Sequence, residues 1–178
     1  WAELLSFTEI ADELARSLHF LSTDQRDVPE RQRSIRAVFE GSWGRLPADA
    51  RRAFARLTVF RGGFTRRAAE AVAGADLQTL RRLVSSSFLA VNSRSQRYEI
   101  HELLRQLAAE AYAGDPIIAE AQSAHSAYYL DQLRRLTPDL KGRRQRAAVA
   151  EIAGDFDNLR AAWQHAAAQL DRAGIASA

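Results

Sequence analysis

The chain has 178 residues, of which 47% are hydrophobic and 26% charged, with four histidines and neither cysteine nor methionine. The lack of cysteine excludes disulfide frameworks and thiolate metal sites. No apolar run approaches the roughly 20 residues that cross a bilayer, so we expect a cytoplasmic protein without a membrane partner. Because the sequence starts on Trp1 and contains no initiator, we expect a piece of a longer protein.

The net charge of +3 is distributed unevenly. Residues 1–28 carry a net charge of −4, and residues 113–178 are neutral. Residues 29–112 carry fifteen arginines and eight carboxylates, which gives a net charge of +7. Arginine forms paired hydrogen bonds with phosphate and carboxylate groups. This basic segment could therefore meet nucleic acid, nucleotide or an acidic neighbouring domain, although its arginines could equally be the solvated faces of alanine-rich helices.

The first half of the chain is predicted to be helical. Residues 1–21 have an apolar stripe at helical spacing, and a polar connector follows, with a domain boundary near Val28. Pro29 opens the next helix, because a missing N–H costs little in a first turn. Gly44 and Pro47 break that helix and start another, whose apolar face contains Ala50, Phe54 and Leu57.

The stretch Phe60-Arg61-Gly62-Gly63-Phe64 cannot continue a helix, since its two glycines favour a tight turn. It lacks the lysine of a phosphate-binding loop, so we interpret it as a structural turn. Thr65 is a suitable N-cap for a helix over Arg66–Ala73, which Gly74 ends. Asp76 caps a further helix, whose apolar stripe consists of Leu77, Leu80, Leu83 and Val84.

Two short apolar runs, Phe88–Val91 and Tyr98–Ile100, flank a polar loop and predict a β-hairpin. Several helices followed by one hairpin form the winged-helix arrangement, a variant of helix-turn-helix. At His101 the apolar period changes from two residues to helical spacing. His101 and Glu102 therefore stand at a helix N-terminus, which suits an anion such as phosphate. Alternatively, His101 only caps or packs the joint between strand and helix.

Helices continue after Gly114-Asp115-Pro116. The first has a broad face formed by Ile117, Ala121, Ala124, Tyr128, Leu133 and Leu136. Arg143–Ala153 and Asp155–Leu170 then read as an antiparallel pair, with Leu159, Trp163 and Leu170 facing inward. The predicted fold is mainly α, a winged helix of helices plus one β-hairpin, followed by an α-helical, repeat-like bundle. We place its domains at residues 1–28, 29–113 and 114–178.

Three stretches taken together resemble a known family. IHELLRQLA resembles the Met-His-Asp motif that closes the winged helix of NB-ARC nucleotide switches, which are STAND-class signal-transduction ATPases. VPERQRSIRAVFEGSW and LTVFRGGFTRRAAEAVAG resemble the bacterial branch of that family. The resemblance runs from about Pro29 to Trp163 and implies that residues 1–28 end a small helical, ARC1-like domain.

The resemblance also implies site residues and partners. His101 would contact the phosphate of ADP held by an upstream ATPase core, and Glu102 would stand for the acid of the motif. ADP or ATP with Mg²⁺ would be the cofactor of the parent protein, whereas the fragment itself would need none. Tetratricopeptide-like repeats would follow downstream. Under this main hypothesis the fragment is a nucleotide-state sensor that relays the ADP/ATP state to those repeats, and nucleic acid is not an expected partner.

We expect no enzymatic activity, since the chain has no phosphate loop and no nucleophile motif. No histidine pair has zinc-helix spacing, so we expect no metal site.

An alternative function is a DNA-binding winged helix of a transcriptional regulator. Arg81 and Arg82 would then face the major groove, and Arg94 on the wing would face phosphate. A third is an interaction module that exposes apolar surface near Trp163 and Leu170 and could self-associate.

Overall fold

The computed structural model describes residues 39–176, and the side chains of residues 39–170. The chain divides into two compact units, residues 1–43 and residues 44–178. In the first unit the described residues, 39–43, are helical, and the rings of Phe39 and Trp43 stack with their centroids 5.2 Å apart. The helix, connector and boundary predicted within residues 1–28, and the helix start at Pro29, lie outside the described residues.

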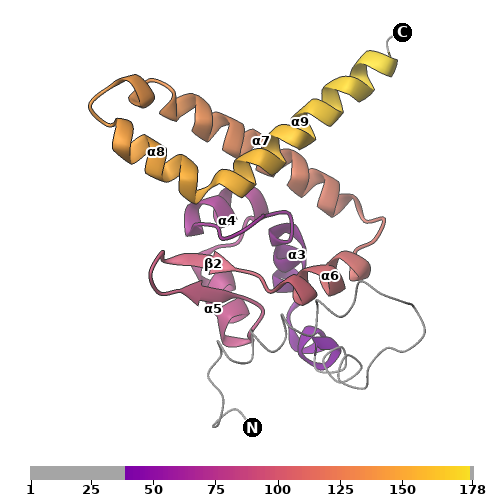
Figure 1. The fold of residues 1–178 in the computed structure, drawn as a ribbon. Helices are drawn as coiled ribbons and strands as arrows, with labels where there is room; N and C mark the ends of the chain where they lie inside the picture. The colour runs from indigo at the N-terminus through magenta and orange to yellow at the C-terminus, as the bar shows by residue number, and fades with distance from the viewer. Residues whose placement is uncertain (1–38, 177–178) are drawn as a thin grey trace, which may run out of the picture. The chain divides into compact units, whose positions relative to one another are not determined.

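In the second unit, three helices lead into a two-stranded antiparallel hairpin, and further helices follow it (Figure 1). The elements are α3 (Ala48–Leu57), α4 (Arg66–Ala73), α5 (Leu77–Ser85), β1 (Ala90–Asn92), β2 (Arg97–Glu99), α6 (Glu102–Ala111), α7 (Pro116–Leu136), the 3-10 turn η2 (Asp139–Lys141), α8 (Gln145–Gly154) and α9 (Phe156–Ala176). This arrangement confirms the predicted fold class, a mainly α winged helix followed by a helical bundle. The domain limit after residue 113 stays a prediction.

Local capping signals fix α4 within the limits that the sequence predicts. The hydroxyl oxygen of Thr65 accepts the backbone N–H of Ala68 at 3.1 Å. Such a cap satisfies one of the free N–H groups of the first turn. At the other end Gly74 adopts a φ of 64°, a left-handed conformation in which a Cβ is strained. The two signals together set where α4 starts and stops.

The predicted hairpin forms, with strands of three residues each, and a third segment joins it. Strands β1 and β2 pair with Val91 opposite Tyr98. Phe64 adds a bridge on the other side of β2, because its N–H donates to the carbonyl oxygen of Tyr98 at 2.9 Å and its carbonyl accepts from the Tyr98 N–H at 2.8 Å. The turn before α4 is thereby tied to the wing, 34 residues later in the sequence.

The core of the second unit is aromatic and continuous from the winged helix into α7. Phe54, Phe60 and Phe64 are fully buried. The rings of Phe60 and Phe64 stack at 4.4 Å, and Phe60 also meets the edges of His125 and Tyr129 of α7. Burial of such large rings supplies much of the hydrophobic stabilisation of a small unit.

Two predictions about the later helices need correction. The predicted inner face of α7 is right at its two ends, where Ile117, Ala121 and Leu136 are buried. In the middle of α7 the buried residues are His125, Ser126 and Tyr129, whereas the predicted Ala124, Tyr128 and Leu133 are only partly buried. Trp163 and Leu170 of α9 do not face inward, since they are 66% and 74% exposed. The C-terminal half of α9 extends beyond α7 (Figure 1). This exposure agrees with the apolar surface expected of an interaction module, whereas self-association stays a prediction.

Candidate nucleic-acid interface

Helix α5 stands at the position of the recognition helix in a winged helix. Its N-cap is Asp76, whose carboxylate accepts the backbone N–H of Thr79 at 2.8 Å. This hydrogen bond holds the pKa of Asp76 below its ordinary value. Leu80 and Leu83 are fully buried and anchor the inner side of the helix. Leu77, predicted to belong to the same apolar stripe, is 50% exposed, because it stands in the first turn, outside the buried face.

The two arginines predicted on this helix differ in their surroundings. Arg81 is exposed, and no carboxylate of the described residues forms an ion pair with it. Arg82 is half-buried, and its guanidinium lies 4.0 Å from the carboxylate of Asp49 on α3. Arg82 is therefore partly engaged within the winged helix. Arg81 shares the outer side of α5 with Gln78 and Ser85, which are also exposed.

The wing is a tight polar loop built on Asn92. The side-chain oxygen of Asn92 accepts the backbone N–H groups of Arg94 at 3.0 Å and Ser95 at 3.1 Å. Gln96 has a φ of 55°, a left-handed conformation that closes the loop back onto β2. Arg94 is exposed at this loop, and within the described residues it has no ion-pair partner. The backbone that carries Arg94 is therefore well fixed, while its guanidinium is available to a ligand.

The helical segment α7–α9 leaves this side of the winged helix open. Figure 1 shows α5 and the wing in the lower part of the second unit, and α7, α8 and α9 in its upper part. We call the outer side of α5 with the wing loop, marked by Gln78, Arg81 and Arg94, the α5–wing face. It combines an exposed helix, an exposed loop and two guanidinium groups that form no ion pair within residues 39–170.

His101 is the N-cap of α6. Its Nδ1 accepts the backbone N–H of Leu103 at 3.2 Å, and its ring is half-buried. Burial lowers the pKa of His101, which favours the neutral ring that this cap requires. Glu102 is exposed and forms an ion pair with Arg105 at 3.1 Å. The geometry thus matches the capping alternative, and a contact of His101 or Glu102 with ADP stays a prediction.

The turn at Phe60–Phe64 has a role that sequence reasoning missed. Asn158 at the start of α9 is buried, and its side chain accepts the N–H of Arg61 at 2.8 Å and donates to the carbonyl of Gly63 at 3.1 Å. His125 of α7 contacts the same Asn158 oxygen at 3.2 Å through Nε2. These bonds satisfy backbone groups that a turn leaves unpaired. The turn is therefore the point at which α7 and α9 dock on the winged helix.

A buried ion pair completes this contact. The guanidinium of Arg97 on β2 binds Asp155 and also donates to the carbonyl of Gly63 at 2.7 Å. Asp155 further accepts from Tyr129 at 3.4 Å and from Gln132 at 3.0 Å. The Asp155 side chain is 8% exposed and that of Arg97 16%. Burial and the nearby Asp155 carboxylate raise the pKa of Tyr129, so its hydroxyl stays a donor. We call the set Arg61, Gly63, Arg97, His125, Asp155 and Asn158 the junction.

The described residues give no sign of two other kinds of site. No group of histidine and carboxylate side chains among them is placed to hold a metal ion. None of the described helices combines the length and the apolar composition needed to cross a bilayer.

Comparison with known proteins identifies large relatives of the chain. It is 33% identical over 168 residues to a protein of Mycobacterium bovis and to two from strains of Mycobacterium tuberculosis, all provisionally named HTH-type transcriptional regulators. The match covers 89% of this chain but only 19% of each relative, so the chain spans about a fifth of their length. No protein-family model and no solved structure matches it.

These names correct two of our expectations. The relatives are named as helix-turn-helix regulators, which contradicts the assignment to NB-ARC or STAND ATPases and the nucleotide-sensor function inferred from it. They also contradict the expectation that nucleic acid is not a partner. The motifs behind the resemblance have structural uses in this chain, since His101 caps α6 and the glycine turn docks α9. ADP or ATP with Mg²⁺ as the cofactor of a parent protein stays a prediction.

Proposed function

We propose that this chain is part of a transcriptional regulator and that its winged helix binds DNA through the α5–wing face. The relatives' names support the regulator assignment. The observation that carries the DNA contact is the pair of exposed guanidinium groups, Arg81 on α5 and Arg94 on the wing, neither paired with a carboxylate in the part of the chain that the structure describes. In a winged helix the recognition helix enters the major groove and the wing lies along the backbone.

The two arginines have different parts in this proposal. Arg81 extends from the outer side of α5, next to Gln78 and Ser85, where arginine and glutamine reach base edges. Arg94 lies on a loop that meets phosphates, so it contributes affinity without sequence preference. Arg82 contributes less to DNA binding than we first expected, because its guanidinium already interacts with the carboxylate of Asp49. The excess of arginine in residues 29–112 adds a general attraction for DNA.

The junction gives the helical segment a part in the same function. Because Asn158 and Asp155 bind the turn and β2 through buried polar groups, α7–α9 moves with the winged helix as one body. A displacement of these helices by other parts of a longer regulator would then reposition the α5–wing face. We further propose that this segment has no catalytic activity of its own, and that downstream repeats are its neighbours.

Gel-shift measurements with a mixed-sequence DNA duplex test the DNA contact. At about 50 mM salt the chain should retard the duplex, and at about 200 mM salt retention should weaken strongly, because released counterions drive binding. The double variant Arg81→Ala/Arg94→Ala should lose retention at both concentrations. The control variant Arg143→Ala/Arg146→Ala removes the same amount of charge outside the α5–wing face, just before and within α8. It should retain the duplex like the unmodified chain. Absence of retention at low salt would refute the proposal.

A further inference from the structure

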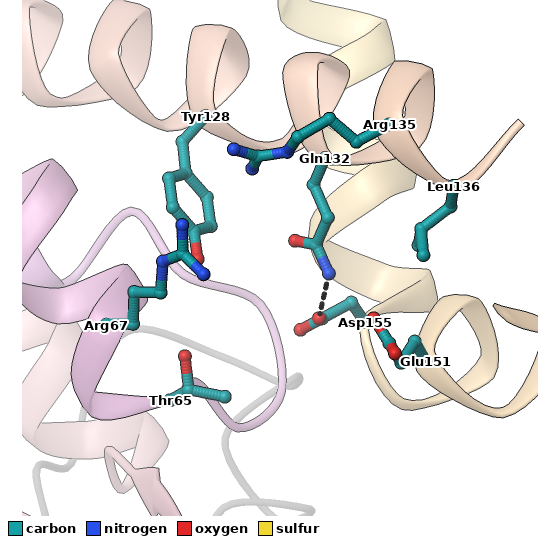
Figure 2. Close-up of a pocket in the computed structure, with 8 residues that line it drawn as sticks. All are labelled: Thr65, Arg67, Tyr128, Gln132, Arg135, Leu136, Glu151 and Asp155. Atoms are coloured by element: carbon teal, nitrogen blue, oxygen red, sulfur yellow. Dashed lines mark hydrogen bonds between the residues drawn. The ribbon is translucent and has the colours of Figure 1, made fainter. Parts of the chain in front are cut away.

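A cavity of about 310 Å³ lies between the start of α4, the C-terminal half of α7, and α8 (Figure 2). Its size is at the lower end of small-ligand sites. The side chains that line it are mainly polar and come from three helices, among them Arg67 of α4, Gln132 and Arg135 of α7, and Glu151 of α8. The α5–wing face contributes none of them, so this cavity is separate from the proposed DNA contact.

Gln132 places an unused acceptor in this cavity. Its amide nitrogen donates to Asp155 at 3.0 Å, and because a carboxylate accepts only, this bond fixes which end of the amide faces Asp155. The amide oxygen is buried and has no hydrogen-bond partner among the described residues. Figure 2 shows it turned away from Asp155, toward the side where the guanidinium groups of Arg67 and Arg135 end. A buried acceptor is costly until a donor reaches it.

Charges of both signs surround this acceptor. The guanidinium groups of Arg67 and Arg135 point toward the same region beside Tyr128 (Figure 2). Arg67 is exposed and has no ion-pair partner among the described residues. Arg135 forms an ion pair with Asp131 at 3.2 Å, so part of its hydrogen-bonding capacity is already used. Across the cavity, Glu151 of α8 is exposed and likewise forms no ion pair in the described part of the chain. Asp155 is already engaged by Arg97.

We propose that this cavity binds a free α-amino acid. The ligand needs an anionic group for Arg67 and Arg135, and next to it a donor for the Gln132 oxygen. An α-amino acid carries both on one carbon atom. Its carboxylate accepts charge-assisted hydrogen bonds from the two guanidinium groups, and its ammonium donates to Gln132 and faces Glu151. Glu151 favours an ammonium over the hydroxyl of a 2-hydroxy acid, since only the ammonium carries a positive charge.

Thermal unfolding of the full 178-residue chain with each of the twenty amino acids in turn tests this site. A ligand that binds only the folded state raises the Tm in a saturable way. At least one amino acid should do so, and titration calorimetry should give a matching Kd. The analogue with a hydroxyl in place of its ammonium and the amine without its carboxylate should each bind at least about tenfold more weakly. No shift with any amino acid would overturn the proposal, as would equal binding of the hydroxy acid.

Variants on the two walls locate the ligand. Arg67→Ala and Glu151→Gln should each weaken binding by about tenfold or more, because each removes one charged partner. Both positions are exposed, so unchanged circular dichroism is expected. Arg146→Ala, on the same helix as Glu151 but outside the cavity, should bind like the unmodified chain. If both wall variants bound the amino acid with unchanged affinity, the ligand would lie elsewhere and the proposal for this cavity would be wrong. The result does not depend on DNA binding, since the α5–wing face is untouched.

Discussion

The junction and the α5–wing face use the same residue type in opposite ways. At the junction, Arg97 is largely buried, paired with Asp155 and bonded to the carbonyl of Gly63. On the α5–wing face, Arg81 and Arg94 are exposed and unpaired within the described residues. The charge of Arg97 stabilises the contact between two parts of the fold, whereas the charges of Arg81 and Arg94 are accessible to a ligand. Burial and pairing, more than arginine content, therefore separate structural arginines from candidate binding residues.

The same comparison revises what the charge of residues 29–112 means. Arg56 pairs with Glu120 at 3.2 Å, Arg82 with Asp49, and Arg105 with Glu102 while it also donates to the carbonyl of Phe60. Each of these contacts engages a positively charged side chain within the protein, so that it is less accessible to DNA. The net charge of +7 consequently overstates the charge that DNA could meet, and Arg81 and Arg94 are the residues on which a mutational test should concentrate.

The largest expected effect is on the stability of the junction. Asp155→Ala leaves Arg97 buried without its partner, which we expect to lower the free energy of unfolding by about 3–5 kcal/mol. Urea unfolding followed by circular dichroism measures it. Asp157→Ala is the matched control, because Asp157 is exposed and, among the described residues, forms an ion pair only with Arg160 at the surface. A loss for Asp155→Ala no larger than for Asp157→Ala would remove the distinction between the two regions.

A smaller effect is expected at the turn itself. Gly62 has a φ of 72°, so Gly62→Ala places a Cβ in the left-handed region and should cost roughly 1–2 kcal/mol. A Cβ there would have room, since its nearest neighbour, the Asp157 carboxylate, is 3.7 Å away. Gly44→Ala, which has no such φ and no atom within 4 Å, should be neutral or slightly stabilising. Equal costs in the two variants would contradict a turn-specific constraint.

The junction should also respond to pH. Burial lowers the pKa of His125 below its ordinary value of 6.5, so the unfolded chain binds more protons than the folded one between the two values. Stability should therefore fall as the pH drops below about 6.5, and the fall should end below the folded-state pKa. Urea unfolding at a series of pH values should show a shallower fall for His125→Gln, which keeps a donor for Asn158. The half-buried His101 contributes in the same direction and remains in both proteins.

The smallest effect on stability is expected on the α5–wing face. Arg81→Ala and Arg94→Ala remove exposed side chains without ion-pair partners in the described structure, so each should change the free energy of unfolding by less than about 0.5 kcal/mol. Urea unfolding of the two variants beside the unmodified chain checks this. A loss above 1.5 kcal/mol, about the size of the Gly62→Ala cost, would mean that the face is structural after all.

Sequence reasoning succeeded where a feature depends on near neighbours. Thr65 and Gly74 bound α4, and Asp76 caps α5, because each cap acts within a few residues of itself. The hairpin was also predictable from two short apolar runs around a polar loop. His101 was placed correctly at the N-terminus of a helix, where it is the N-cap of α6, but spacing alone could not show which role it has there.

The junction could not be predicted, because its partners are far apart in the sequence. Asn158 binds the turn across 95 and 97 residues, and Asp155 binds Arg97 across 58. His125 gave no metal-site spacing and was set aside, although it is buried against Phe60. Trp163 was assigned to the inner face of the last helix together with Leu159 and Leu170, yet only Leu159 of the three is buried and Trp163 is 66% exposed.

The most direct test of the DNA contact is the salt dependence of binding to a mixed-sequence duplex, measured by fluorescence anisotropy. The logarithm of affinity should fall linearly with the logarithm of salt concentration. For Arg94→Ala the slope should be smaller by about 1 than for the unmodified chain, because one phosphate contact is lost. For Arg146→Ala it should be unchanged. Equal slopes for the unmodified chain and Arg94→Ala would contradict the assignment of DNA binding to the α5–wing face.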